Sequence, residues 1–160
     1  MNFLHNANWE NPAQFISFFD KDQRPKPEFL QKTLTFWFAD DKGYLTTAPR
    51  EDLGFVQTPQ WFGNIMYNDP LGAANSMFFL AIQIGRNGFF SCAFAGTNVV
   101  FLREALDEVG GLAYGTVTED SLTGCRLQAK GYKSIYSSDI LAVGDAPESP
   151  AEAMQQLKRW

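Results

Sequence analysis

The sequence predicts an α/β fold, because short apolar segments typical of buried strands alternate with segments that have helical spacing. Turn residues such as Gly, Pro and Asn separate these segments. Hydrophobic residues make up 45% of the 160 residues, which is enough for a core, and the length suits one domain. We therefore expect residues 1–160 to form a single domain, and we interpret both ends as cut from a larger one.

The first elements surround two acidic residues. Residues 15–19 form an apolar segment that ends at Asp20 and is predicted to be a buried strand. Residues 28–38 have apolar side chains at helical spacing. Residues 54–58 predict a second strand, which Pro59 stops.

The second half of the chain continues the alternation of helix and strand. We expect a helix over 73–85, a strand over 98–102, a helix over 103–109, a helix from Thr118 to Lys130, a strand over 133–136 and a helix over 151–160. Gly110-Gly111 and Gly131 are expected to end the helices that precede them.

Composition excludes several function classes. A net charge of −5 argues against nonspecific nucleic-acid binding. No apolar run approaches the length of about 18 residues that a membrane span needs. His5 is the only histidine, so a Ser/His triad or a His-rich metal site is excluded. Cys92 and Cys125 lack metal-ligand spacing and are interpreted as reduced, buried thiols.

An acidic pair, Asp20 and Asp22, follows the first strand. Open α/β sheets place ligand-binding groups beyond the carboxyl ends of their strands. Two carboxylates two residues apart can hold Mg²⁺ or Mn²⁺ and leave room for substrate phosphates. The alternative is an acidic turn with no ligand.

A second acidic pair, Glu119 and Asp120, directly follows Thr118 at the start of a predicted helix. One carboxylate could take the proton from a sugar hydroxyl as its oxygen attacks. The alternative is that Thr118 caps the helix and the acids face the helix dipole.

Gln156, Arg159 and Trp160 have the spacing that puts side chains on one helix face. Arg159 could bind a diphosphate, Trp160 could stack on a sugar and Gln156 could bond hydroxyl groups. The alternative is an exposed helix end. Upstream, the small residue Gly96 would let a ligand approach the backbone closely.

Taken together, these motifs resemble the processive inverting glycosyltransferases of the cellulose synthase type, in family 2 with a QxxRW motif. The resemblance covers nearly the whole chain and keeps the family's order. It is carried by Asp20 with Asp22, residues 55–60 (FVQTPQ), residues 94–97 (FAGT), residues 118–120 (TED) and residues 156–160 (QLKRW). Lys21 and Gln23 depart from the family's usual Asp-Ala-Asp-His run, and the family's upstream uridine-contacting Asp has no match.

The resemblance implies a GT-A-type nucleotide-sugar-binding fold, a mixed central sheet flanked by helices, incomplete at the N-terminus. It implies Asp120 as catalytic base, and Mg²⁺ or Mn²⁺ at Asp20 and Asp22. Substrate contacts would come from Glu119, Gln156, Arg159, Trp160, Gly96, Thr97 and Gln57. We expect Asp22, Asp120 and Arg159 to converge on one cleft.

The implied reaction transfers glucose from a UDP-sugar to the non-reducing end of a growing β-glucan, with inversion. Chitin-type, hyaluronan-type or other β-glycan synthesis remains an alternative, as does a non-catalytic carbohydrate-binding or scaffold role. The parent protein is expected to be a multi-pass membrane protein with this domain on the cytoplasmic side, and a synthase complex is a candidate partner.

Overall fold

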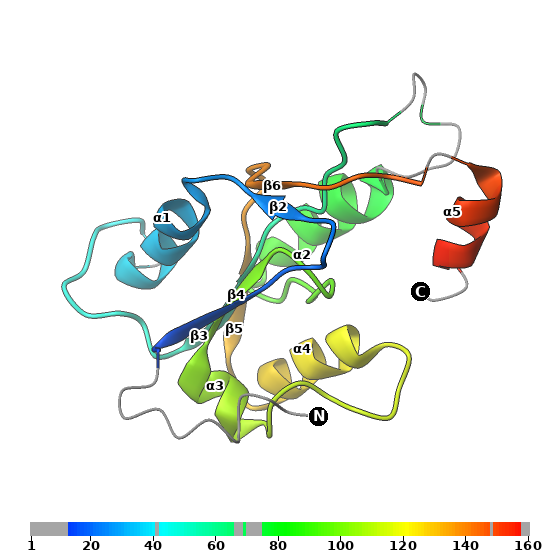
Figure 1. The fold of residues 1–160 in the computed structure, drawn as a ribbon. Coiled ribbons are helices and arrows are strands. Elements are labelled where there is room, and N and C mark those ends of the chain that lie inside the picture. Colours follow the sequence, from blue (N-terminus) through cyan, green and yellow to red (C-terminus); the bar gives the residue numbers. More distant parts are fainter. Residues whose placement is uncertain (1–12, 41, 66–68, 70–74, 148, 158–160) are drawn as a thin grey trace.

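The computed structural model describes residues 13–40, 42–65, 69, 75–147 and 149–157. These residues form a four-stranded mixed sheet in the order β1-β4-β3-β5 (Figure 1). The strands are β1 (Phe15–Phe18), β4 (Val99–Leu102), β3 (Leu53–Gln57) and β5 (Lys133–Tyr136). Both β1 and β3 run antiparallel to β4, whereas β5 runs parallel to β3. The carboxyl ends of β1 and β3 therefore lie at the edge where β4 begins.

Helices flank the sheet (Figure 1). They are α1 (Phe29–Leu34), the 3₁₀ helix η1 (Thr35–Phe38), the π-helix η2 (Met77–Ile82), α2 (Gln83–Asn87), α3 (Arg103–Glu108), α4 (Glu119–Ala129) and α5 (Pro150–Leu157). The predicted α/β class is confirmed.

The two faces of the sheet are covered by different helices. On one face, Trp37 of η1 packs edge-on against Phe15, with ring centroids 4.9 Å apart, and its indole N–H donates to the Leu53 carbonyl at 2.9 Å. On the other face, Gly124 of α4 lies against Phe55. The absence of a side chain at Gly124 lets α4 pack closely on the sheet, and α4 carries Asp120 at its start.

The centre of the core is aromatic. Phe55, Phe94 and Phe101 are buried, and each ring packs against the other two, with centroids 5.0 to 6.3 Å apart. Such pairs contribute about 0.5–1.5 kcal/mol each beyond the area they bury. Many of the fifteen phenylalanines thus build the core, and Phe94 joins that core to the site described below.

Several local expectations need correction. The helix predicted over 28–38 is divided into α1 and η1, and the one predicted over 73–85 is a π-helix followed by α2. A small antiparallel sheet of β2 (Arg24–Pro25) and β6 (Ala142–Val143) was not predicted, because two residues carry no periodicity. Cys92 is buried as expected, but Cys125 is exposed on α4.

The predicted helix ends are confirmed at two glycines. Gly110 and Gly131 have positive φ angles of 83° and 96°. This region of backbone conformation favours glycine, because the Cβ atom of any other residue would be crowded by the backbone. The Tyr132 amide donates to the Leu127 carbonyl across Gly131, closing α4. None of the helices formed by the described residues is long and apolar enough to cross a membrane.

Candidate active site

A pocket of about 290 Å³ lies at the sheet edge where β1 and β3 end and β4 begins. Five segments build it: the turn after β1, the segment after β3, the start of η2, the loop before β4 and the start of α4. Its lining residues are Asp20, Gln60, Asn75, Phe78, Phe79, Phe94, Ala95, Gly96, Val117, Thr118, Glu119, Asp120 and Ser121. The position agrees with the expectation that ligand groups lie beyond the strand ends.

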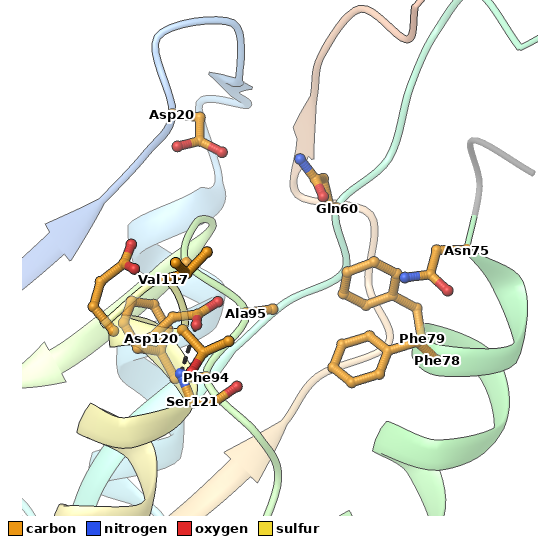
Figure 2. Close-up of a pocket in the computed structure, with 13 residues that line it drawn as sticks. Asp20, Gln60, Asn75, Phe78, Phe79, Phe94, Ala95, Val117, Asp120 and Ser121 are labelled. Atoms are coloured by element: carbon orange, nitrogen blue, oxygen red, sulfur yellow. Dashed lines mark hydrogen bonds between the residues drawn. The ribbon is translucent and has the colours of Figure 1, made fainter. Parts of the chain in front are cut away.

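The pocket has two chemically different sides. Figure 2 shows Asp20 and Asp120 on one side, with Phe78, Phe79 and Asn75 across from them. Carboxylates can bind a cation or accept a proton, whereas aromatic faces bind apolar surfaces such as sugar rings. The arrangement therefore suits a ligand that is both charged and ring-shaped.

Asp120 is the second residue of α4 and is half-buried. Its carboxylate accepts a hydrogen bond from the Ser121 amide at 2.6 Å. Burial raises the pKa of the Asp120 carboxyl, and the charge of Glu119 raises it further, against the lowering effect of the Ser121 bond. A raised pKa makes this carboxylate a stronger base than an ordinary aspartate.

Thr118 occupies the N-cap position of α4, but its side chain makes no capping hydrogen bond. Its hydroxyl lies 3.3 Å from that of Thr116 instead. Thr118 therefore occupies the expected N-cap position, but its side chain does not form the capping hydrogen bond. A carboxylate, that of Asp120, bonds a free amide at the helix start.

Asp20 is exposed at the rim of the pocket. Partial desolvation raises the pKa of its carboxyl, and the charges of Asp22, Asp120 and Glu119 add to the effect. Four carboxylates thus share one region of negative potential, which a bound cation would neutralise. Asp22 does not line the pocket, although it lies close enough to affect Asp20.

Gln57 and Thr97 are buried and do not line the pocket. The Gln57 amide nitrogen donates to the Thr97 carbonyl at 2.7 Å, and its oxygen accepts from the Ala95 amide at 3.0 Å. Gln57 therefore holds the loop that carries Gly96. The direct substrate contacts expected of Gln57 and Thr97 stay predictions.

Gly96 lines the pocket and has a φ of 81°, a conformation that favours glycine. A Cβ atom at this position would lie 3.3 Å from Oδ2 of Asp120. The missing side chain thus makes room for the Asp120 carboxylate as well as for a ligand.

The C-terminal motif is only partly described. The backbone of Gln156 belongs to α5, which stands apart from the sheet in Figure 1. The side chain of Gln156, and all of Arg159 and Trp160, lie outside the described residues. Their predicted convergence with Asp120 stays a prediction.

Sequence reasoning missed part of the lining. Gln60 belongs to the FVQTPQ segment, so that motif could have indicated it. Phe78 and Phe79 were expected only as parts of a helix, and no spacing rule separates ring residues that face a pocket from those that face a core. Asn75 has a φ of 41°, a backbone feature with no sequence signal beyond the residue type.

A comparison with protein families decides the classification. The family model described as glycosyl transferase family group 2 matches residues 15–160. The chain belongs to this family. The match includes both acidic pairs and the C-terminal motif on which the expected resemblance was based.

The chain is similar to cellulose synthase catalytic subunits from other organisms. The chain is 41% identical over 160 residues to a UDP-forming cellulose synthase catalytic subunit of Dictyostelium discoideum, covering 99% of this chain and 14% of that protein. It is 31% identical over 155 residues to the UDP-forming cellulose synthase catalytic subunit of Xanthomonas axonopodis pv. citri, covering 92% and 20%. The chain therefore spans about a seventh to a fifth of the length of these relatives.

The fold is shared with a mannosyltransferase from Pyrobaculum calidifontis solved in complex with GDP-Man and Mn²⁺. The TM-score is 0.53 at 21% sequence identity, covering 91% of this chain and 36% of the mannosyltransferase. The expected GT-A-type fold, with a mixed sheet flanked by helices, is confirmed.

Proposed function

We propose that this domain transfers glucose from UDP-glucose to the non-reducing end of a growing β-glucan, with inversion at the anomeric carbon. The observation that carries the proposal is the half-buried Asp120 carboxylate, which opens α4 and faces the same pocket as Asp20. The names of the relatives, UDP-forming cellulose synthases, support glucose and UDP as the donor's parts.

Asp120 would act as the general base. The acceptor hydroxyl gives its proton to the Asp120 carboxylate while its oxygen forms a bond to the anomeric carbon of the donor. The bond from that carbon to the diphosphate breaks on the opposite side, UDP leaves, and the α linkage becomes β. The raised pKa of Asp120 favours this role, because a base works best when its pKa approaches the working pH.

The residues at the turn after β1 fit a hard divalent cation. Asp20 and Asp22 offer carboxylate oxygens, and the surrounding carboxylates make the turn strongly negative. The described residues do not gather three or more His, Cys, Asp or Glu side chains into a cation cage. Mg²⁺ and Mn²⁺ suit such a site, since they keep open positions for phosphate oxygens. A bound cation would supply positive charge at the leaving diphosphate.

The sugar rings would lie between the two sides of the pocket. Phe78 and Phe79 offer aromatic faces for ring stacking, and Gln60 and Asn75 offer amides for hydroxyl groups. Glu119 and the backbone at Gly96 would contact the sugar on the opposite side. Gln156, Arg159 and Trp160 would add diphosphate and acceptor contacts. Gln57, through its bonds to Thr97 and Ala95, would hold the loop that carries Gly96 in place.

A binding titration tests this proposal. UDP is titrated into the intact protein with Mn²⁺, with Mg²⁺ and with a chelator. We expect binding that needs the cation and that is lost in Asp22→Ala. A control variant, Asp139→Ala, changes an exposed aspartate that pairs with Lys32 outside the pocket and should bind UDP normally. Cation-independent UDP binding, equal in both variants, would contradict the metal site.

A second candidate is a non-catalytic carbohydrate-binding domain, which the aromatic side of the pocket would also suit. It would bind β-glucan oligosaccharides without needing UDP or a cation. Synthesis of chitin, hyaluronan or another β-glycan is a further alternative, and linkage analysis of the product separates these. A membrane-embedded parent with this domain on the cytoplasmic side, within a synthase complex, is part of the proposal and would be tested by protease protection in sealed vesicles.

A further inference from the structure

The turn that carries the acidic pair is closed by a ring of hydrogen bonds. The Gln23 amide donates to the Asp20 carbonyl at 3.0 Å, which forms the turn itself. The Asp20 amide donates to the Thr97 hydroxyl at 2.9 Å, and that hydroxyl donates to Oδ1 of Asn98 at 3.2 Å. Nδ2 of Asn98 then donates to Oε1 of Gln23 at 3.0 Å, which closes the ring. The side chain of Asn98 therefore holds both ends of the turn.

Asn98 is itself fixed to the sheet. It is fully buried, its Nδ2 also donates to the Pro59 carbonyl at 3.0 Å, and its carbonyl accepts from the amide and hydroxyl of Thr58, each at 3.0 Å. Its φ is 55°, a left-handed conformation that asparagine adopts more readily than most residues. Both the residue type and the backbone are thus suited to this position.

A glycine supports the opposite side of the turn. Gln23 is 4% exposed, and a Cβ at Gly144 would overlap its Nε2 and lie 2.8 Å from its Cδ. The Gln23 side chain is therefore confined to the space between Gly144 and Asn98. Its Nε2 is buried without a hydrogen-bond partner among the described residues, so the Asn98 bond is the one that holds the amide.

The same loop reaches the proposed base. Gly96 lies two residues before Asn98, and its Cα faces Oδ2 of Asp120 so closely that a Cβ would be 3.3 Å away. Residues 96–98 therefore contact the turn of the acidic pair through side chains and Asp120 through the backbone. This segment links the two acidic groups of the pocket.

We propose that Asn98 is a positioning residue, which fixes the turn bearing Asp20 and Asp22 at a set place relative to Asp120. The inference rests on the proposed function for the role of that turn in cation and donor binding. Hydrogen bonds arranged in a chain polarise one another, and a buried ring of this kind holds one geometry. A released turn would still carry its carboxylates but would no longer present them together to one ligand.

The test compares Asn98→Gly with wild type in the intact protein. Glycine keeps the left-handed backbone and removes the side chain, and with it the two ring bonds to Thr97 and Gln23 and the bond to the Pro59 carbonyl. Asn64→Gly is the matched control, because Asn64 also bridges two segments, with bonds to the carbonyl and amide of Ala146, but lies outside the pocket. Thermal unfolding verifies that both variants fold.

Hydrogen exchange measures the turn directly. We expect the Asp20 amide to exchange about 10-fold or more faster in Asn98→Gly, since loss of two hydrogen bonds of about 1 kcal/mol each corresponds to this range. The Val100 amide in β4 should exchange as in wild type, and Asn64→Gly should leave Asp20 unchanged. Unchanged protection of Asp20 in Asn98→Gly would overturn the proposal.

Ligand binding provides the second readout. We expect Mn²⁺-dependent UDP binding to weaken about 10-fold in Asn98→Gly, while UDP binding in chelator stays at the wild-type level. If wild type binds UDP with Mn²⁺ and Asn98→Gly binds it equally well, the positioning role is overturned. If wild type shows no cation-dependent binding, the proposed function fails, and the exchange of the Asp20 amide still decides whether Asn98 holds the turn.

A second variant approaches the ring from the other side. Gly144→Ala leaves Asn98 intact but forces Gln23 out of its place, so it should reproduce the faster Asp20 exchange and the weaker cation-dependent binding. Gly63→Ala is its control, because Gly63 bonds to Gly144 and its Cβ would meet only Val143, at 3.3 Å. Equal behaviour of the two alanine variants at Asp20 would contradict the proposal.

Discussion

Replacing Gly96 by alanine separates backbone strain from displacement of the proposed base. Gly96 has a φ of 81°, and an alanine there would place Cβ 3.3 Å from Oδ2 of Asp120. Gly110 has a nearly identical φ of 83°, but a Cβ there would meet nothing within 4 Å. Gly96→Ala and Gly110→Ala therefore impose the same backbone cost, and only the first one touches the pocket.

The expected magnitudes follow from this difference. A left-handed alanine costs about 1–2 kcal/mol, and its smaller unfolded-state entropy returns about 0.4–1 kcal/mol. Each variant should then lose about 1 kcal/mol of unfolding free energy, or about 2–4 °C in Tm for a domain of this size. In Gly96→Ala, the Asp120 carboxylate must also shift by a few tenths of an ångström, which should lower kcat by about 3- to 10-fold.

The assay measures glucan synthesis and thermal unfolding of both variants in the intact protein. We expect similar Tm values for the two variants, wild-type kcat in Gly110→Ala and a reduced kcat in Gly96→Ala. Equal kcat values in the two variants would refute the reasoning, because the contact with Asp120 would then have no effect on the reaction.

Two further predictions concern stability and the loop before β4. Hydrogen bonds from Arg50 lower the pKa of Asp52 to about 2, so its stabilising effect is present above its ordinary pKa near 4 and is lost as the pH falls toward 2. Asp52→Asn should cost about 1 kcal/mol at pH 7, a value reduced by solvent screening, and progressively less as the pH falls through the folded-state pKa of about 2; a pH-independent cost in thermal unfolding would contradict this. Gln57→Met removes the buried amide that bonds the loop, and should cost about 2–3 kcal/mol in denaturant unfolding. A cost under about 0.5 kcal/mol would show that the loop does not depend on Gln57.

The fold class and most elements could be predicted because apolar runs and helical spacing determine them locally. The strand that ends before Asp20 and the helix that opens with Glu119 were both expected, and together they bring Asp20, Glu119 and Asp120 to the pocket. The two-residue strands β2 and β6 could not be predicted, because they exist only through pairing across more than a hundred residues.

The candidate site could be predicted from the sequence only in part. Asp22, Asp120 and Arg159 were expected in one cleft on the basis of motifs. The structure places Asp120 at a pocket together with Asp20, whereas Asp22 does not line that pocket and Arg159 lies outside the described residues. The expected contact of Gln57 with substrate stays a prediction, and the hydrogen bonds of its buried side chain to backbone groups are a feature that no motif reveals. The role of Gly96 beside Asp120 likewise depends on a contact between distant segments.

The most direct test of the account is the Asp120→Asn variant of the intact protein. Asparagine keeps the shape of the side chain and cannot accept the acceptor proton, so glucan synthesis should fall below detection while Mn²⁺-dependent UDP binding stays at the wild-type level. Glucan synthesis at a rate comparable to wild type in Asp120→Asn would contradict the assignment of this carboxylate as the base.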